Sequence, residues 1–412
     1  MPSTAGRVRA DGEPGAPELL VAALRAAQQD PDDAAASLTH PFHSYPARLH
    51  PATARVLVDI VGSRMPAEDM PLVDPFCGSG TVLVEARAAR INAIGVDLNP
   101  LAVLVARAKS WSGTARRREE FRELGHQIAG AVMAAGKAAR RSGAEAPGLR
   151  KPQGFDPNAR DRRLAAWFAP HVRRELELLA THCDEMRERD PELGALLTAC
   201  LSAILYKVSS RTSDTDSTWV DRNIPRGAPA RHVGQRVELL FAGIGDMRSN
   251  STSQIVETDA RALESVVRAG TVGGIVTSPP YAGTYDYADH QRLRFDFLAL
   301  RHKDLDQREI GSRRSFEADP DEAHRTWRRA LTDTIDAITK ALAPGALAAI
   351  VIGDSNAQGR AFYAIDDVRE ALTDELGLVA WASQERPMLG GAEHRAFGDR
   401  PKAEHAILFR RR

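Results

Sequence analysis

The 412-residue chain is 43% hydrophobic and 27% charged, as globular proteins are, and its 55 basic and 55 acidic residues cancel, so any surface for nucleic acid must be local. Three cysteines (Cys77, Cys183 and Cys200) without a CxxC pair exclude a disulfide framework and argue against a metal site. There is neither a signal-peptide core nor an apolar run of about 18 residues, so we expect a cytoplasmic protein with no membrane contact.

The first 39 residues are expected to be an N-terminal extension. Residues 1–17 are rich in Gly, Pro and charge, which predicts disorder, and residues 18–28 have helical spacing. The segment HPFHSYPARLHP at 40–51 then leads into a helix expected over 52–61.

A strand–turn–helix–strand pattern begins at residue 71. It consists of a short apolar strand (71–73), a glycine-rich turn, a helix (81–89), a second strand (93–96) and a further helix from Pro100. This is a βαβ unit, so a parallel sheet is expected. We assign residues 40–109 to the cofactor-binding part of one α/β domain.

Between about residues 110 and 250 the strand signals vanish and long helical patterns replace them, at 162–189 and 191–208. Residues 107–163 contain 14 Lys or Arg against 6 Asp or Glu, and a polar stretch at 209–232 is expected to be a loop. We interpret residues 110–250 as a helical insertion with a role in target recognition.

The sheet pattern returns over residues 251–412, the predicted catalytic part. Strands are expected at 255–258, 274–276, 344–354, 378–388 and 404–412, with helices over 321–342 and 364–377. No helical pattern separates the last two strands, which predicts an antiparallel hairpin that closes the sheet.

The glycine-rich turn is the first motif that carries chemistry. Its glycines let the backbone bend tightly and let a cofactor approach closely, although a plain βα turn would look the same. A carboxylate at the end of the second strand, Asp97, can accept hydrogen bonds from both hydroxyls of a ribose. Together the two features favour a cofactor that contains adenosine. The turn has the residues Asp74, Pro75, Phe76, Cys77, Gly78, Ser79, Gly80 and Thr81.

The second motif follows the apolar strand 274–276 and has the residues Ser278, Pro279, Pro280 and Tyr281. Two prolines fix the backbone and remove two N–H donors, so the loop presents rigid acceptors. An exocyclic amine on a base is a poor nucleophile because its lone pair is delocalised. The Ser278 hydroxyl and the Pro279 carbonyl can accept its hydrogens and localise that lone pair, while Tyr281 stacks on an extruded base. The alternative is a proline turn with a purely structural role.

These two motifs resemble those of the DNA amino-methyltransferases, the cytosine-N4 and adenine-N6 enzymes. The FxGxG turn of that family matches Phe76, Gly78 and Gly80, and its (D/N/S)PP(Y/F/W) motif matches Ser278 to Tyr281. The resemblance implies a doubly wound, mostly parallel, seven-stranded Rossmann-like sheet, S-adenosylmethionine as the cofactor and double-stranded DNA with a flipped base as the substrate. Ser278 resembles the cytosine-N4 branch, and a partner restriction endonuclease is possible by the same likeness.

The resemblance also assigns cofactor contacts outside the turn. Tyr45 and Arg48 match the segment that contacts the methionine end of the cofactor. Asp97 and Leu98 would lie at the ribose, and Asp259 near the adenine amino group.

Aromatic and basic residues interleave just after Tyr281, as a base-flipping site requires. The same stretch could instead pack a helix in the core through Leu293, Phe295 and Phe297. The basic runs at 116–118 and 140–141 could contact phosphates or be solvated helix faces. The candidate nucleic-acid contacts are Arg211, Arg222, Tyr285, Tyr287, His290 and Arg292, with Arg294 in the same stretch.

Several alternatives remain at this stage. Adenine N6 could replace cytosine N4 as the target. An RNA methyltransferase acting on guanine N2 is less favoured, because no RNA-binding module stands in the first 40 residues. A non-catalytic binding protein on the same scaffold is disfavoured by the intact motifs. No cysteine lies in the SPPY loop, which argues against the covalent chemistry of cytosine-C5 enzymes.

Overall fold

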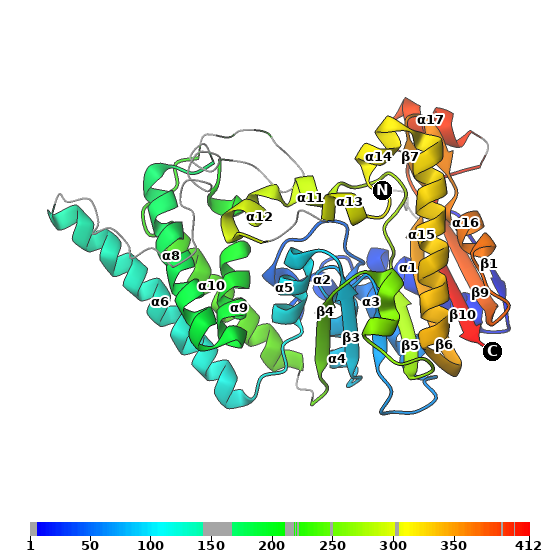
Figure 1. Cartoon of the computed structure of the whole chain (residues 1–412), viewed down its shortest axis with the longest axis horizontal. Helices are drawn as coiled ribbons and strands as arrows, with labels where there is room; N and C mark the ends of the chain where they lie inside the picture. The colour runs from blue at the N-terminus through cyan, green and yellow to red at the C-terminus, as the bar shows by residue number, and fades with distance from the viewer. Residues whose placement is uncertain are drawn as a thin grey trace.

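The computed structural model describes residues 6–142, 167–210, 218, 220, 222–247, 250–300, 305–388, 390–398 and 400–412. Figure 1 shows a lobe built around a twisted sheet and, beside it, a lobe of helices. Among the helices that are described, none is both long and apolar enough to cross a membrane.

Eight strands form the main sheet in the order β1-β9-β10-β6-β5-β2-β3-β4. The five from β4 to β6 run parallel, β10 is antiparallel to β6 and to β9, and β1 is antiparallel to β9. The strands are β1 Val8–Gly12, β2 Leu72–Asp74, β3 Ala93–Asp97, β4 Ser253–Glu257, β5 Val272–Thr277, β6 Leu342–Gly353, β9 Leu376–Glu385 and β10 Ala403–Arg411, and a separate small hairpin joins β7 Ser355–Ala357 to β8 Arg360–Phe362.

The chain order reverses between β2 and β5. From β2 it proceeds outward through β3 to β4, and it then returns to place β5 on the other side of β2. In doubly wound sheets ligands bind at the carboxyl ends of the strands beside such a switch point. The fold is therefore α/β, doubly wound and mostly parallel, as the sequence predicts.

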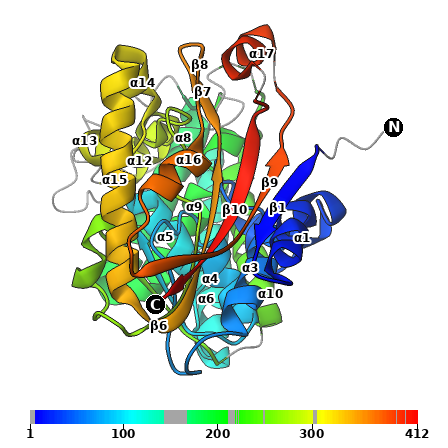
Figure 2. The ribbon, with the colours of Figure 1, turned by 90° about the vertical axis from the view of Figure 1, so that its right-hand side faces the viewer.

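Helices cover both faces of the sheet (Figure 2). One face packs on α1, α3, α4 and α5 through an aliphatic cluster, and the other packs on η3, α15 and α16. The helices of this lobe are α1 Ala16–Gln29, α2 Asp33–Ala36, η1 His40–Phe42, α3 Pro51–Gly62, α4 Thr81–Ala88, α5 Pro100–Lys109, η3 Ala260–Ser265, α13 Leu305–Arg308, α14 Arg313–Ala318, α15 Pro320–Ala341, α16 Ala364–Glu370 and α17 Gly391–Phe397.

Two expectations for the ends of the chain are wrong. Residues 8–12, predicted to be disordered, form β1, an eighth strand beyond the seven expected, because their backbone pairs with the edge of β9 although most of their side chains are exposed. A short helix, α17, also separates β9 from β10 where no helical pattern is visible. The two strands nevertheless pair as the predicted antiparallel hairpin.

The helical lobe lies between α5 and β4 in the chain and has its own core. That core continues onto one side of α5 and onto α12, so the two lobes share one apolar cluster. α10 begins at Ala228, inside the stretch expected to be a loop, and residues 162–166 of the predicted helix 162–189 lie outside the described residues. The lobe contains α6 Ala115–Ser142, α8 Pro170–Arg189, α9 Pro191–Ser202, η2 Tyr206–Val208 and α10 Ala228–Met247, and is approached by α11 Tyr287–His290 and α12 Arg292–Leu298.

The two ends of this lobe meet at one buried arginine of the sheet lobe. Arg87, on α4, is 2% exposed. It donates to the carbonyls of Ser110 (3.2 Å) and Trp111 (2.6 Å), where the lobe begins, and to that of Ser251 (3.1 Å), where it ends. A single guanidinium therefore satisfies three carbonyls from both junctions.

We expect Arg87→Met to lower the free energy of unfolding by about 3 kcal/mol or more, because it leaves three buried carbonyls without their donor. Chemical denaturation monitored by circular dichroism measures this. Arg116→Met, the same change at an exposed position of α6, is the matched control. Equal stability of the two variants would contradict a joining role for Arg87.

Candidate functional site

The glycine-rich turn lies at the carboxyl end of β2, at the switch point. Gly78 and Gly80 have φ of 49° and 82°, the left-handed region that favours glycine. A Cβ on Gly80 would lie 3.0 Å from the Cα of Ala106, because α5 passes directly over the turn. The backbone conformation therefore favours glycine at both positions.

Asp97, at the end of β3, organises the turn from the next strand. Its Oδ2 accepts from the N–H of Gly78 (2.8 Å) and its Oδ1 from the N–H of Asn99 (2.8 Å). Each carboxylate oxygen has a second lone pair, so the group can still accept two hydroxyls. Asn99 caps α5 and donates to the hydroxyl of Tyr45 (3.2 Å), which brings the 40–51 segment to the same place.

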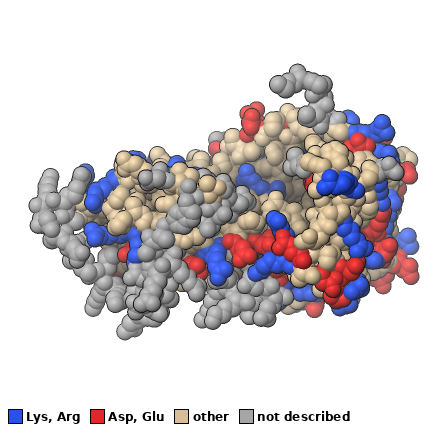
Figure 3. Space-filling view, turned by 90° about the horizontal axis from the view of Figure 1, so that it is seen from above, with Lys and Arg blue, Asp and Glu red and all other residues tan. Residues whose placement is uncertain are grey.

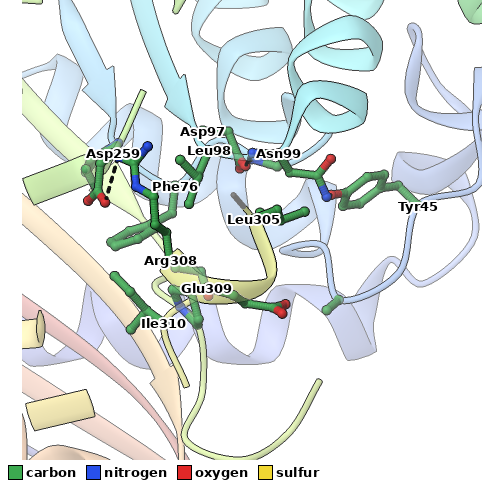
Figure 4. A pocket seen from close by; sticks show the side chains of 16 residues that line it. Tyr45, Phe76, Asp97, Leu98, Asn99, Asp259, Leu305, Arg308, Glu309 and Ile310 are labelled. Atoms are coloured by element: carbon green, nitrogen blue, oxygen red, sulfur yellow. Dashed lines mark hydrogen bonds and ion pairs between the residues drawn. The ribbon is translucent and has the colours of Figure 1, made fainter. Parts of the chain in front are cut away.

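These groups line a cavity that we call the switch-point pocket. In Figure 4, Asp259 and Tyr45 lie toward opposite ends of it, with Asp97 and Asn99 between them. Its lining residues are Tyr45, Ala47, Pro75, Phe76, Gly78, Asp97, Leu98, Asn99, Asp259, Ala260, Ser278, Pro280, Leu305, Arg308, Glu309 and Ile310.

Asp259 occupies one end of the pocket and is engaged by two arginines. Arg261 forms an ion pair with its carboxylate (2.7 Å), and Arg308 on α13 reaches it at 3.3 Å (Figure 4). Burial raises the pKa of Asp259, but the hydrogen bonds and charges of Arg261 and Arg308 outweigh it and hold the pKa below its ordinary value. The carboxylate expected near an adenine amino group is therefore ionised and already shared with a cation.

An adjoining pocket extends the cavity over the turn, with Arg48, Ser79, Thr81 and Ser278 in its wall. Ser79 and Thr81 are almost fully buried, and neither hydroxyl has a hydrogen-bond partner among the described residues. Buried hydroxyls without partners are costly, so they indicate a ligand. Arg48 donates to the carbonyl of His40 (2.9 Å). Hydroxyls and a guanidinium suit the carboxylate end of an amino-acid moiety, so this donor set fits S-adenosylmethionine.

Cys77 contributes only backbone here. Its thiol packs beneath the turn against Gly95, and burial raises the pKa of the thiol well above its usual value. A neutral, buried thiol is not a nucleophile. Among the described residues, no cluster of three or more His, Cys, Asp or Glu could hold a metal ion.

The SPPY loop leaves the end of β5, next to β2. Thr277, the last residue of β5, donates to Asp74 (2.6 Å), the last residue of β2. Asp74 also accepts from the N–H of Phe76 (3.1 Å). One buried carboxyl therefore joins the glycine-rich turn to the SPPY loop.

The prolines and Tyr281 are held from the far side of the loop. Trp327 on α15 donates its indole N–H to the carbonyl of Pro280 (3.0 Å). The ring of Tyr281 lies so close to Gly353 that a Cβ there would be 2.6 Å from its Cε2, and its hydroxyl donates to Glu404 (3.2 Å). Pro279 is buried.

The residues predicted to contact nucleic acid differ in how the structure places them. Arg211 lies outside the described residues, as does the side chain of Tyr287. Arg222 donates to the carbonyls of Tyr206 and Lys207 (both 3.2 Å), and Arg292 is exposed beside Asp289.

Tyr285 and His290 form a contact between their rings, and the carbonyl of His290 accepts from Tyr206. Arg294 cannot hold a phosphate as expected, because it is 1% exposed and donates to Ser202 in the core. The apolar residues around it are buried, as the alternative interpretation required. Arg117, in the run 116–118, is paired with Asp190 (2.7 Å).

Sequence reasoning missed four residues of the site: Asn99, Arg308, Trp327 and Glu404. Asn99 directly precedes Pro100, and an Asn–Pro helix start is a readable capping signal. The other three lie 47 to 123 positions from the residues that they contact. No spacing in the sequence marks them.

Burial raises the pKa of Asp97 to about 6, although three backbone N–H groups oppose the shift. If Asp97 accepts ribose hydroxyls, binding requires its ionised form. Affinity for S-adenosylhomocysteine should then be constant above the pKa and fall as the pH drops through it, by up to tenfold per pH unit. Isothermal calorimetry between about pH 8 and pH 5 measures this.

Asp97→Asn should bind about tenfold or more weakly at neutral pH and lose the pH dependence. Glu264→Gln, the same kind of change at an exposed position of η3 that does not line the pocket, is the matched control and should behave as the wild type. An unchanged affinity for S-adenosylhomocysteine in Asp97→Asn would exclude Asp97 as the acceptor of the ribose hydroxyls.

Comparisons with known proteins agree with this geometry. The family model described as UPF0020, RMKL-like, methyltransferase domain matches residues 41–132, which contain the glycine-rich turn and Asp97. The type II methyltransferase M.MvaI of Kocuria varians is 41% identical over 73 residues, 18% of this chain and 16% of that protein. The type II methyltransferase M.MjaII of Methanocaldococcus jannaschii is 20% identical over 395 residues, 78% of this chain and 72% of that protein.

Similar solved structures include TrmN from Thermus thermophilus, with 12% identity and a TM-score of 0.36 over 90% of this chain and 52% of that one. The rRNA methyltransferase AviRa from Streptomyces viridochromogenes has 10% identity and a TM-score of 0.34 over 92% and 93%. The match to M.MvaI spans only a small part of that enzyme. From the family model and the curated relatives, together with the site, we conclude that this chain carries a methyltransferase domain.

Proposed function

We propose that this chain transfers a methyl group from S-adenosylmethionine to an exocyclic amine of a base in double-stranded DNA, with cytosine N4 as the target. The observation that carries the proposal is the position of the SPPY loop. Ser278 and Pro280 line the same pocket as Asp97 and the glycine-rich turn, while Tyr281 lines a second cavity.

Two further points support DNA and cytosine. The two curated relatives are named type II methyltransferases, a name used for DNA enzymes of restriction–modification systems, so a partner endonuclease is part of the proposal. Serine at the first position of the loop favours cytosine N4 over adenine N6.

The cofactor supplies a sulfonium methyl, which is already a good electrophile, so the protein has mainly to position the amine. The Ser278 hydroxyl and the Pro279 carbonyl accept the two amine hydrogens and direct the nitrogen lone pair toward the methyl carbon. With the cofactor bound, the new N–C bond would form as the C–S bond breaks, S-adenosylhomocysteine would leave, and the methylated amine would release one proton to solvent water. Tyr281 holds the ring by stacking.

The helical lobe is proposed to recognise the target sequence. It lies beside the carboxyl ends of the strands, and Figure 3 shows this face hollowed near its centre, with basic side chains in the hollow and on the helical lobe. Basic groups there can bind phosphates while the base is read elsewhere.

The decisive experiment incubates the protein with labelled S-adenosylmethionine and with DNA or RNA, and identifies the methylated nucleoside by mass spectrometry. We expect N4-methylcytosine in DNA. Ser278→Ala and Tyr281→Ala should each lower the rate about 100-fold or more, since both act on the reacting base. N6-methyladenine would overturn the choice of base, and label in RNA alone would overturn the choice of polymer.

The indole of Trp327 should act as a positioning group for the SPPY loop. Trp327→Phe keeps the ring but removes the donor to Pro280, so we expect kcat to fall about tenfold with KM for DNA nearly unchanged. Leu331→Val, a change at a buried apolar position one turn further along α15, is the control for a local packing change. Unchanged kcat in Trp327→Phe would exclude this positioning role.

A further inference from the structure

The SPPY loop also lines a second cavity, which we call the β7 pocket. Its wall includes Tyr281 and Tyr285 from the loop region, Ser355 and Asn356 from β7, Arg386, and Glu404 from β10. The switch-point pocket takes Ser278 and Pro280 from the same loop. One four-residue motif thus lines two cavities.

The loop packs directly on β7. A Cβ on Gly283 would lie 3.0 Å from the Cβ of Ala357, the last residue of β7. The residue before β7, Asp354, is fixed as well, because it accepts from the N–H groups of Ala364 and Ala403 (both 3.0 Å). The wall of the β7 pocket is therefore positioned relative to the SPPY loop.

The basic residues that line the pocket are already paired. Arg386 contacts Glu404, Lys402 lies 2.8 Å from Glu393, and Arg313 lies 2.9 Å from Glu317. A phosphate would have to compete with these carboxylates. Paired charges around an aromatic ring suit instead a neutral, polar, planar ligand.

Two polar atoms in the wall have no hydrogen-bond partner among the described residues. They are the hydroxyl of Ser355, a residue only 5% exposed, and the buried amide oxygen of Asn356. Buried polar groups are nearly always bonded, so each requires a partner that the protein does not supply. The oxygen and nitrogen of the Asn356 amide exchange places on rotation, so the buried position can present a donor or an acceptor.

We infer that the β7 pocket holds the target base, and that Asn356 is a specificity-determining residue that donates its amide N–H to the ring nitrogen beside the amine-bearing carbon. In cytosine that atom is N3. Tyr281 then stacks on the ring while Ser278 faces the amine. This inference rests on the proposed function and extends it to a residue outside the SPPY motif.

The test measures nucleoside binding, without catalysis. Saturation-transfer NMR compares 2′-deoxycytidine with its 3-deaza analogue, which lacks the N3 acceptor, on the full chain with S-adenosylhomocysteine present. The wild type should bind deoxycytidine about tenfold more tightly than the analogue. Asn356→Ala should bind both equally and weakly.

Asn356→Asp keeps the shape and the acceptor but removes the donor, so it should lose the preference as well. Gln358→Ala, an exposed amide at the rim of the same pocket, should keep it. No binding of deoxycytidine to the wild type, or a preference that survives in Asn356→Ala, would overturn the inference.

Failure of this inference can be distinguished from failure of the proposed function. If the wild type methylates cytosine in DNA and Asn356→Ala does so equally well, the inference fails and the proposed function stands. If deoxycytidine binding depends on Asn356 but no methyl reaches DNA, the pocket stands and the proposed function fails.

Discussion

The hydrogen bond from Thr277 to Asp74 is the contact on which the site depends. The two residues are 203 positions apart in the chain, yet they end adjacent parallel strands, so the sheet brings their side chains together. Burial raises the pKa of Asp74 to about 7, and the bonds from Thr277 and Phe76 oppose that shift. The glycine-rich turn and the SPPY loop are thus fixed to each other by one carboxyl, independently of any ligand.

The helical lobe stabilises the site as well as lying beside it. Arg236 on α10 donates to the carbonyls of Pro41 and Phe42 (3.0 and 2.9 Å), just before Tyr45. His43 contacts Ser202 on α9 (3.0 Å). The lobe proposed to recognise DNA therefore also holds the segment that lines the switch-point pocket.

The parts predicted from the sequence are those whose signals are local. The strand ending at Asp74, the turn after it and the strand ending at Thr277 each combine an apolar run with glycine or proline, and all three lie where expected. β1 was missed because its stability comes from pairing with the distant β9, not from its own residues. The burial of Arg294 was not predicted for a related reason. Its partner in the core, the carbonyl of Ser202, lies 92 positions away in the chain, so no local pattern distinguishes Arg294 from an exposed basic residue.

Aspartates at the carboxyl ends of the strands hold the loops of the site in place. Asp74 and Asp97 are the last residues of β2 and β3, Asp354 directly follows β6, and Asp259 lies just beyond β4. Asp74, Asp97 and Asp259 each accept a backbone N–H from two residues further along the chain, and Asp354 accepts the N–H of Ala364 at the start of α16. Carboxylates that accept these backbone N–H groups hold the loops of the site in fixed positions. A sulfonium methyl needs an aligned lone pair more than it needs a strong base, so loops held in this way suit amine methylation, which depends on the position of the acceptors.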